Sequence, residues 1–201
     1  MALLEVCVDS LAGLRAAEEG GAGRIELCSR LDLGGLSPDR ELLEAALGNA
    51  RLPLHVMVRT RPGSFVYTPS METEILSLRG LGVPGVVLGA LTADRRLDSA
   101  ALRRLVAAAR PMSITFHRAF DEIAEQLLAL DELIELGFDR VLTSGGAPDA
   151  FQGRGRLREL VSRARGRIVV MAGGGVRADN AAAILRDAGV PELHGSVPFR
   201  L

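Results

Sequence analysis

The sequence contains no lysine, and all 24 of its basic residues are arginine. Without an ε-amino group the chain cannot form a Schiff base with a carbonyl substrate or hold pyridoxal phosphate as an internal aldimine. Lysine-dependent aldolase chemistry and pyridoxal-dependent catalysis are therefore excluded.

Other features are scarce as well. The 201 residues include 2 cysteines, too few for a disulfide framework. The net charge is -1 with no block of like charges, so neither nucleic acid nor an anionic membrane is an expected partner. No apolar run reaches the roughly 20 residues of a membrane helix, and no basic segment precedes one as in a signal peptide. We expect a cytoplasmic protein.

Three short stretches alternate in an unusual way. In residues 4–9, 24–29 and 54–59, every second residue except Ser29 is Leu, Ile or Val, and the others include Glu, Cys, His, Met, Arg and Asp. Parallel strands covered by helices on both faces are normally almost continuously apolar. Because helical patterns separate these strands, the sheet is predicted to be parallel with one polar face. A closed barrel with a polar interior fits, whereas a doubly wound open sheet, the alternative, leaves the polar face unexplained.

The rest of the chain repeats this rhythm and predicts one domain, residues 1–201, with the (β/α)8 TIM-barrel fold. No helix is expected after the eighth strand, which leaves a seam between the first and last strands. Strands are predicted at 4–9, 24–28, 54–59, 85–89, 113–117, 140–143, 167–171 and 193–196. Helices are predicted from Ser10 to the Gly20–Gly21 stop and at 39–47, 70–81, 98–109, 121–136, 157–165 and 178–188.

Two cysteines fall at the carboxyl ends of neighbouring predicted strands. Cys7 and Cys28 have the interior parity, and neighbouring strands lie about 4.8 Å apart, so their sulfur atoms can approach each other. Together with Met57 on the next strand they form a soft donor set that suits Cu(I). The alternative is that these side chains only fill barrel space, because no CxxC spacing accompanies them.

Ionisable side chains follow the same parity. We predict that six of them converge on the barrel mouth, where carboxylates and imidazoles serve acid–base catalysis and an arginine holds an anion. The alternative is a buried network of ion pairs that fills the barrel. The six are Glu5, Glu26, His55, Arg59, His117 and Asp121.

Glycine-rich turns follow the sixth and seventh strands, at Ser144-Gly145-Gly146 and at Gly173-Gly174-Gly175. Free backbone amides in such turns can bind a phosphate group, and TIM barrels often bind phosphate at the loops after strands seven and eight. The alternative is that glycine merely allows a tight strand-to-helix turn.

These residues together resemble the CutC family of copper homeostasis proteins over essentially the whole chain. The resemblance is carried by the motifs EVCVDS (5–10), GGAGRIELCS (20–29), HVMVR (55–59), TFHRAFD (115–121), RVLTSGG (140–146), GGGV (173–176) and ELH (192–194). It implies a cytoplasmic (β/α)8 barrel that forms a homo-oligomer, a dimer or a tetramer, and is linked with copper binding or trafficking. The cysteines proposed as Cu(I) ligands in that family match Cys7 and Cys28.

The chain departs from the family pattern in three places. Arg59-Thr60-Arg61 stands where the family has Arg-Pro-Arg, Ala172 stands where it has proline before the three glycines, and little sequence follows strand eight.

Three hypotheses of function result. The first is Cu(I) binding by Cys7 and Cys28 with Met57 as a third ligand. The second is an enzyme for a small anionic or phosphorylated substrate, with Glu26 and His117 as acid and base, Arg59 as anion clamp and the glycine turns as anion cradle. The third is a scaffolding barrel.

Overall fold

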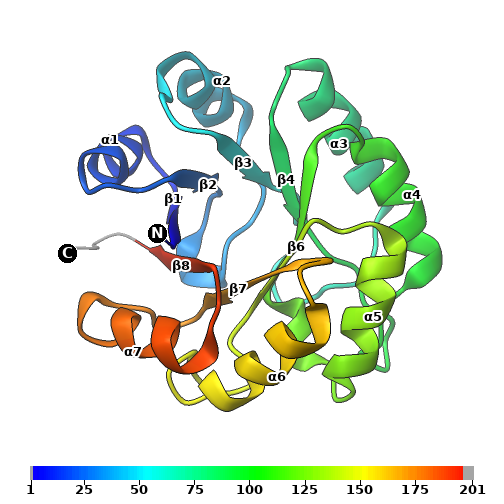
Figure 1. Ribbon diagram of the computed structural model, residues 1–201. Helices are drawn as coiled ribbons and strands as arrows, with labels where there is room; N and C mark the ends of the chain where they lie inside the picture. Colours follow the sequence, from blue (N-terminus) through cyan, green and yellow to red (C-terminus); the bar gives the residue numbers. More distant parts are fainter. Residues whose placement is uncertain (1, 197–201) are drawn as a thin grey trace.

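The computed structural model describes residues 2–196. Its eight strands form a closed barrel in sequence order, every neighbouring pair is parallel, and β8 pairs with β1 to complete the ring. The helices surround the strands (Figure 1). The predicted (β/α)8 fold is confirmed, and the closed ring rules out the open sheet.

The elements alternate throughout. The strands are β1 (Leu3–Val8), β2 (Arg24–Leu27), β3 (Leu54–Met57), β4 (Gly85–Leu88), β5 (Ser113–Phe116), β6 (Arg140–Thr143), β7 (Val169–Gly173) and β8 (Glu192–Ser196). The helices are α1 (Leu11–Glu19), α2 (Arg40–Asn49), α3 (Pro69–Gly80), α4 (Ser99–Ala109), α5 (Gln126–Leu136), α6 (Arg154–Ala164) and α7 (Ala178–Ala188), with short 3-10 turns η1 (Leu31–Leu33) and η2 (Arg118–Glu122).

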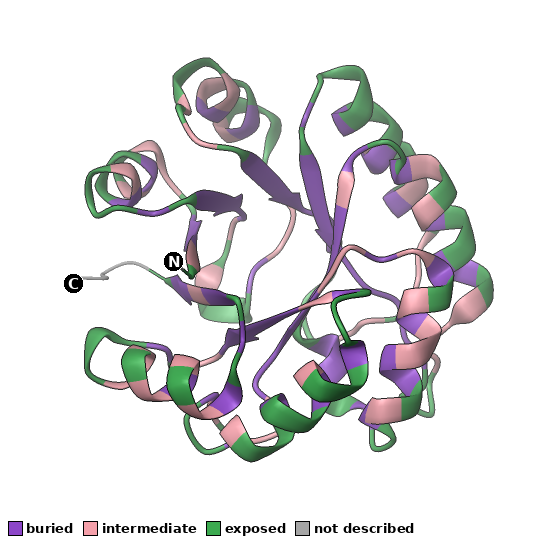
Figure 2. Cartoon of the chain, viewed as in Figure 1, coloured by how far each residue is buried: buried purple, intermediate pink, exposed green. Residues whose placement is uncertain are grey.

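The strands bury both of their faces (Figure 2). Their apolar parity, which includes Val6, Ile25 and Val56, belongs to the large cluster of buried residues that joins strands to helices. Burying such a side chain stabilises the fold by about 1.5–3 kcal/mol, which fixes the register of each strand. The other parity therefore faces the barrel axis, as predicted for Cys7 and Glu26.

The strand registers stack the inward residues in layers, each drawn from alternate strands as is usual in this fold. We call the two lower layers the floor: Arg24, Gly85, Arg140 and Glu192, then Glu5, His55, Thr115 and Met171. We call the two upper layers the mouth: Glu26, Val87, Leu142 and His194, then Cys7, Met57, His117 and Gly173.

Local signals explain most element ends. The side chains of Ser10, Asp39 and Asp98 accept backbone N–H bonds at the starts of α1, α2 and α4. Gly137 and Gly189 end α5 and α7 in the left-handed conformation that glycine adopts without strain.

One predicted helix is wrong in its first turn. Residues 121–136 were expected to form a single helix, but the chain forms η2, then an extended connection, and α5 begins only at Gln126. The cause is Asp121, whose carboxylate accepts backbone N–H bonds from the turn after β6 instead of facing solvent.

The β1–β8 junction differs from the rest of the barrel surface. Within residues 2–196, α7 and α1 lie on either side of this junction and no helix crosses it (Figure 1). None of the helices over this range combines the length and the apolar composition needed to cross a bilayer.

Candidate functional site at the barrel mouth

A cavity of about 1510 Å³ opens at the carboxyl ends of the strands. This is the end of a TIM barrel at which active sites are found. Six of the residues predicted from the sequence to bind a ligand or a metal line it through their side chains: Cys7, Glu26, Met57, Arg59, His117 and Asp121.

The two cysteines meet on one side of this cavity. Cys7 Sγ lies 2.9 Å from Cys28 Sγ, and Cys28 Sγ contacts the carbonyl oxygen of Val8 at 3.6 Å. Met57 packs in the same small buried cluster. The hydrogen bond with Cys28, burial and the nearby Glu26 carboxylate raise the pKa of Cys7 well above its usual value, so Cys7 is a thiol at neutral pH.

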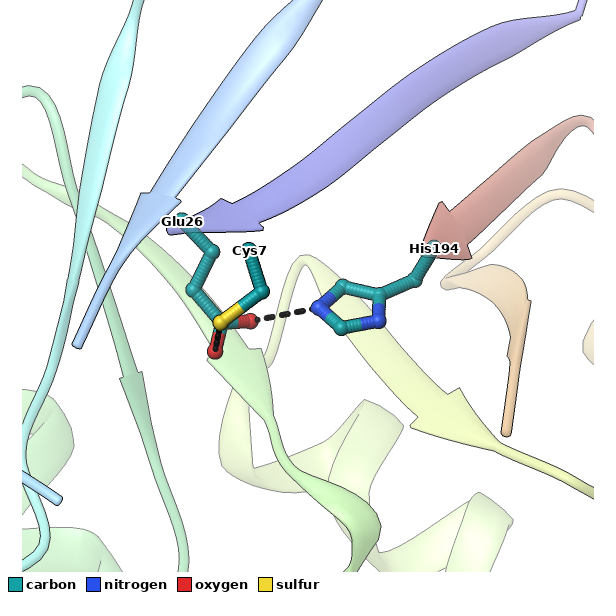
Figure 3. A group of neighbouring side chains, drawn as sticks. All are labelled: Cys7, Glu26 and His194. Carbon is teal, nitrogen blue, oxygen red and sulfur yellow. Dashed lines mark hydrogen bonds and ion pairs between the residues drawn. The ribbon is translucent and has the colours of Figure 1, made fainter. Parts of the chain in front are cut away.

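Glu26 connects Cys7 to a histidine on β8 (Figure 3). Cys7 Sγ donates to Glu26 Oε1 at 3.4 Å, and His194 Nε2 lies 3.1 Å from Glu26 Oε2. Burial favours the neutral form of both partners, but their mutual attraction and hydrogen bond prevail. The pKa of Glu26 is lowered and that of His194 is raised, and both shifts favour the charged forms of the two side chains.

Ligand atoms of Cys7, Glu26 and His194 all lie within 4.8 Å of one another, close enough to hold one metal ion. The sequence predictions of metal ligands and catalytic residues did not include His194. The signal that could have identified it is its place in the ELH motif of the last strand, where it has the same parity as the inward-facing Glu192.

Arg59, just after β3, is held rigidly at the cavity wall. Its Nη1 donates to the carbonyl oxygens of Leu33 at 3.1 Å and Gly35 at 3.0 Å, and its guanidinium lies 4.6 Å from the centre of the Phe65 ring. The side chain is only 8% exposed, and burial lowers its pKa. Its Nε is buried and has no hydrogen-bond partner within residues 2–196.

His117, just after β5, has a defined tautomer. Its Nδ1 accepts the backbone N–H of Ala119 at 3.3 Å, so the proton of the neutral ring belongs on Nε2. Burial, and then the positive charge of Arg59, lower the pKa of His117 to about 4. The ring also packs on Phe65, with centroids 5.1 Å apart.

Each of the three histidines lies against a glycine on a neighbouring part of the barrel. A Cβ at Gly85 would overlap the ring of His55, one at Gly89 would overlap the ring of His117, and one at Gly173 would press on His194. Gly173, predicted as part of an anion cradle, lies within β7, where its small size leaves room for its neighbours.

Glu5 and His55 were predicted to lie at the mouth, but they lie one layer lower, in the floor. Strand parity decides which side chains face inward, whereas their height depends on the stagger of the strands. Arg24 donates to Glu5 and Glu192, and Arg140 Nε donates to Glu192 at 2.7 Å. Burial raises the pKa of Glu5 and, with the charges of Arg24 and Arg140, lowers that of His55 to about 3.

The predicted phosphate cradle at Ser144–Gly146 is already filled by the chain itself. The Asp121 carboxylate accepts the backbone N–H groups of Ser144 at 3.0 Å and Gly146 at 3.1 Å, and the N–H of Gly145 bonds to Thr143 Oγ1 at 2.8 Å. Arg118 Nε also donates to Asp121, at 2.9 Å. Asp121 is thus a structural anion, and this turn offers no free amide to a ligand.

The turn after β7 is different. Gly174 and Gly175 line the cavity in the left-handed conformation, and the guanidinium of Arg118 fills the space where a Gly174 side chain would stand. Arg177 and the first residues of α7 complete this rim.

Known proteins match almost the whole chain in sequence. Residues 2–198 match the CutC family. The chain therefore belongs to the CutC family. A CutC family protein of Caulobacter vibrioides is 48% identical over 198 residues, which is 96% of this chain and 80% of that protein. The mouse protein named copper homeostasis protein cutC homolog is 44% identical, over 96% of this chain and 73% of its own length.

A crystal structure of CutC from Streptococcus agalactiae superimposes with a TM-score of 0.90 at 34% identity, covering 97% of this chain and 98% of that one. An aldolase superimposes with a TM-score of 0.73 at 18% identity, which shows a shared fold alone. Membership of the CutC family, and with it a relation to copper homeostasis proteins, is thus confirmed.

Proposed function

We propose that this protein binds Cu(I) in the cytosol through the thiols of Cys7 and Cys28. The observation that carries the proposal is the 2.9 Å approach of the two sulfur atoms beside the cavity that Cys7 lines. Thiolates are the donors that select Cu(I), and the thioether of Met57 in the same cluster is a suitable third ligand. The names of the mouse and human relatives agree with this reading.

The neighbours of Cys7 suit metal binding in a second way. A thiol must lose its proton before its sulfur can bind a metal. The Glu26 carboxylate accepts a hydrogen bond from Cys7 and is the group placed to receive that proton. His194 fixes the orientation of Glu26 from the other side, as outer partners of metal ligands commonly do.

The test is an anaerobic Cu(I) titration in competition with a chromophoric chelator. We expect one Cu(I) per wild-type chain and an affinity about 100-fold lower or worse in the Cys7→Ser, Cys28→Ser double variant. Met57→Leu should weaken binding less, and Met71→Leu, a matched change of a buried methionine in the outer core, should have no effect. Equal Cu(I) affinity in the wild type and the double variant would contradict the proposal.

A further variant separates the two donor sets that share Cys7. Cys7, Glu26 and His194 offer sulfur, oxygen and nitrogen, a set typical of Zn²⁺ rather than Cu(I). If the sulfurs hold Cu(I), His194→Gln should weaken binding clearly less than the double cysteine variant does, because His194 acts on the sulfurs only through Glu26. A loss as large as in the double cysteine variant would move the site to the Cys7–Glu26–His194 group.

The family resemblance also predicts a homo-oligomer, a dimer or a tetramer. Light scattering on the purified protein tests this part of the proposal independently of copper.

A further inference from the structure

The mouth cavity is far larger than a metal ion requires. Its volume of about 1510 Å³ exceeds the roughly 300–1,000 Å³ of typical pockets for small organic ligands. The sulfur atoms, Glu26 and His194 come from β1, β2 and β8 and occupy one part of its wall. Arg59 and His117 follow β3 and β5 and form another part, which copper binding leaves without a role.

Arg59 brings an uncompensated positive charge to this wall. It forms no ion pair with any carboxylate of residues 2–196, and Glu122, whose charge acts on it, pairs with Arg95 at 3.6 Å. A buried cation without a counter-ion is costly. Carbonyl oxygens satisfy Nη1 alone. Nε is also unpaired but is shielded from solvent, so Nη2 is the guanidinium nitrogen left to donate to a carboxylate or phosphate group.

His117 adds a neutral donor beside this charge. The Ala119 N–H occupies Nδ1, while Phe65 and Gly89 pack against the ring, which is 4% exposed. Nε2–H is therefore the polar group that the ring can offer to the cavity, which His117 lines. Since Nε2 carries the proton, this nitrogen is a hydrogen-bond donor and not a metal ligand.

We propose that Arg59 and His117 bind the oxyanion, a carboxylate or a phosphate group, of a small organic molecule that occupies the barrel mouth beside the thiols. Phe65, which contacts both side chains, holds the two donors together. Of the other arginines that line the cavity, Arg118 is paired with Asp121, and Arg177 lies two residues before Asp179, so Arg59 is the cation that the proposal uses. This inference does not depend on copper, because none of these residues belongs to the sulfur cluster.

Calorimetric titration of the metal-free, reduced protein tests the proposal. The probes are pyruvate and succinate as carboxylates, glycerol 3-phosphate as a phosphate monoester, and inorganic phosphate, each against sodium chloride at equal ionic strength. We expect saturable binding of at least one organic probe, and the class that binds identifies the group. Arg59→Lys, which keeps the charge but loses the planar guanidinium that the carbonyl oxygens at Nη1 position, should weaken that binding about tenfold or more.

Matched variants keep the test sharp. Arg104 is also stacked on an aromatic ring, Tyr67 at 4.7 Å, but on the outer surface, so Arg104→Lys should bind like the wild type. His117→Phe should weaken binding and His117→Gln, which retains an N–H donor, should weaken it less. The Cys7→Ser, Cys28→Ser variant should keep oxyanion binding even if it loses Cu(I).

Three outcomes would overturn the proposal: no organic probe binds better than chloride, inorganic phosphate alone binds, or Arg59→Lys and Arg104→Lys weaken binding equally. Because the titrations contain no metal, these outcomes are independent of whether the sulfurs bind Cu(I).

Discussion

In the floor of the barrel, Arg24 is paired with Glu5 and Glu192, and Arg140 reaches Glu192 as well as the hydroxyls of Ser113 and Thr115. At the mouth, Arg59 has no carboxylate partner within the described part of the chain, and the polar contacts of the thiols are with each other, with Glu26 and with the carbonyl oxygen of Val8. Both regions are lined by ionisable groups. Charges that satisfy one another fill space, whereas charges and donors left open at a cavity are available to a ligand.

The floor is not perfectly satisfied. Glu5 Oε1 and His55 Nδ1 are buried without hydrogen-bond partners in the described residues, although His55 Nδ1 lies 3.9 Å from Glu5 Oε2. Glu5 Oε1 itself lies 3.9 Å from His194 Nε2. Neither Glu5 nor His55 lines the cavity, so their unpaired atoms do not face an incoming ligand. The floor and the mouth therefore differ in whether their residues line the cavity, and not simply in whether they contain polar atoms without hydrogen-bond partners.

Removing the central cation of the floor should have the largest effect. Arg24→Met leaves Glu5 buried without its cation and Glu192 with Arg140 alone, so the free energy of unfolding should fall by about 3–5 kcal/mol. Urea denaturation measures this loss. Arg40→Met, which breaks the exposed pair with Glu44, is the control and should cost about 1 kcal/mol or less. Similar losses in the two variants would remove the distinction between floor and surface.

The three histidines predict the pH dependence of stability. His55 and His117 have pKa values lowered to about 3 and about 4 in the folded protein, below the 6.5 of the unfolded chain. Their contribution is present above pH 6.5 and is lost as the pH falls toward those values, at about 1.4 kcal/mol per pH unit for each. His194 has a raised pKa, so its contribution is complete below pH 6.5 and is lost as the pH rises through the folded value.

Between pH 6.5 and 4.5 the unfolding free energy should therefore decrease with acidification. His55→Gln should make this decrease shallower by about 1.4 kcal/mol per pH unit, whatever its stability at pH 7. Denaturant titrations across this range measure the slope, and an unchanged slope in the variant would show that His55 is not held neutral.

Two glycines test floor and mouth with the same substitution. Gly85→Ala pushes a methyl group into the His55 ring and should cost about 1–3 kcal/mol of stability without changing oxyanion binding. Gly89→Ala pushes into His117 and should weaken oxyanion binding as well. Gly48→Ala, in α2 with open space around it, should stabilise the protein by about 0.5–1 kcal/mol. If Gly85→Ala and Gly89→Ala weaken oxyanion binding equally, the two layers are not separate.

The smallest change in stability should come from replacing the thiol of Cys28 by a hydroxyl group. Cys28→Ser keeps a donor near the carbonyl oxygen of Val8, so the unfolding free energy should change by about 1 kcal/mol or less. Urea denaturation of this variant establishes that any loss of Cu(I) binding comes from the missing sulfur. A loss of several kcal/mol would mean that the cysteines mainly pack the barrel.

The alternation in residues 4–9 and 24–29 was enough to predict the barrel and the inward direction of Cys7 and Glu26, because side-chain direction in a strand depends only on parity. It was not enough for Glu5 and His55, whose height depends on how eight strands are staggered against one another. Local sequence contains no information on that stagger.

Contacts between distant segments were also beyond the sequence. Asp121 was predicted to begin a helix. The neighbouring sequence does not indicate that its carboxylate accepts hydrogen bonds from the backbone amides of residues 144 and 146. The pairing of His194 with Glu26 joins residues 168 positions apart and exists only because β8 closes on β1. The sequence thus predicts which kinds of side chain form the site, but not which of them are hydrogen-bonded to one another.

The arginines beneath the cavity have a lasting electrical consequence. A guanidinium keeps its proton at any pH at which a protein remains folded, whereas a buried lysine readily loses its own. Arg24 therefore keeps its positive charge beneath the cavity, whereas its partners Glu5 and Glu192 are carboxylates that acid can neutralise. A molecule in the mouth thus lies above a layer that becomes more positive on acidification and whose positive charge alkali does not remove.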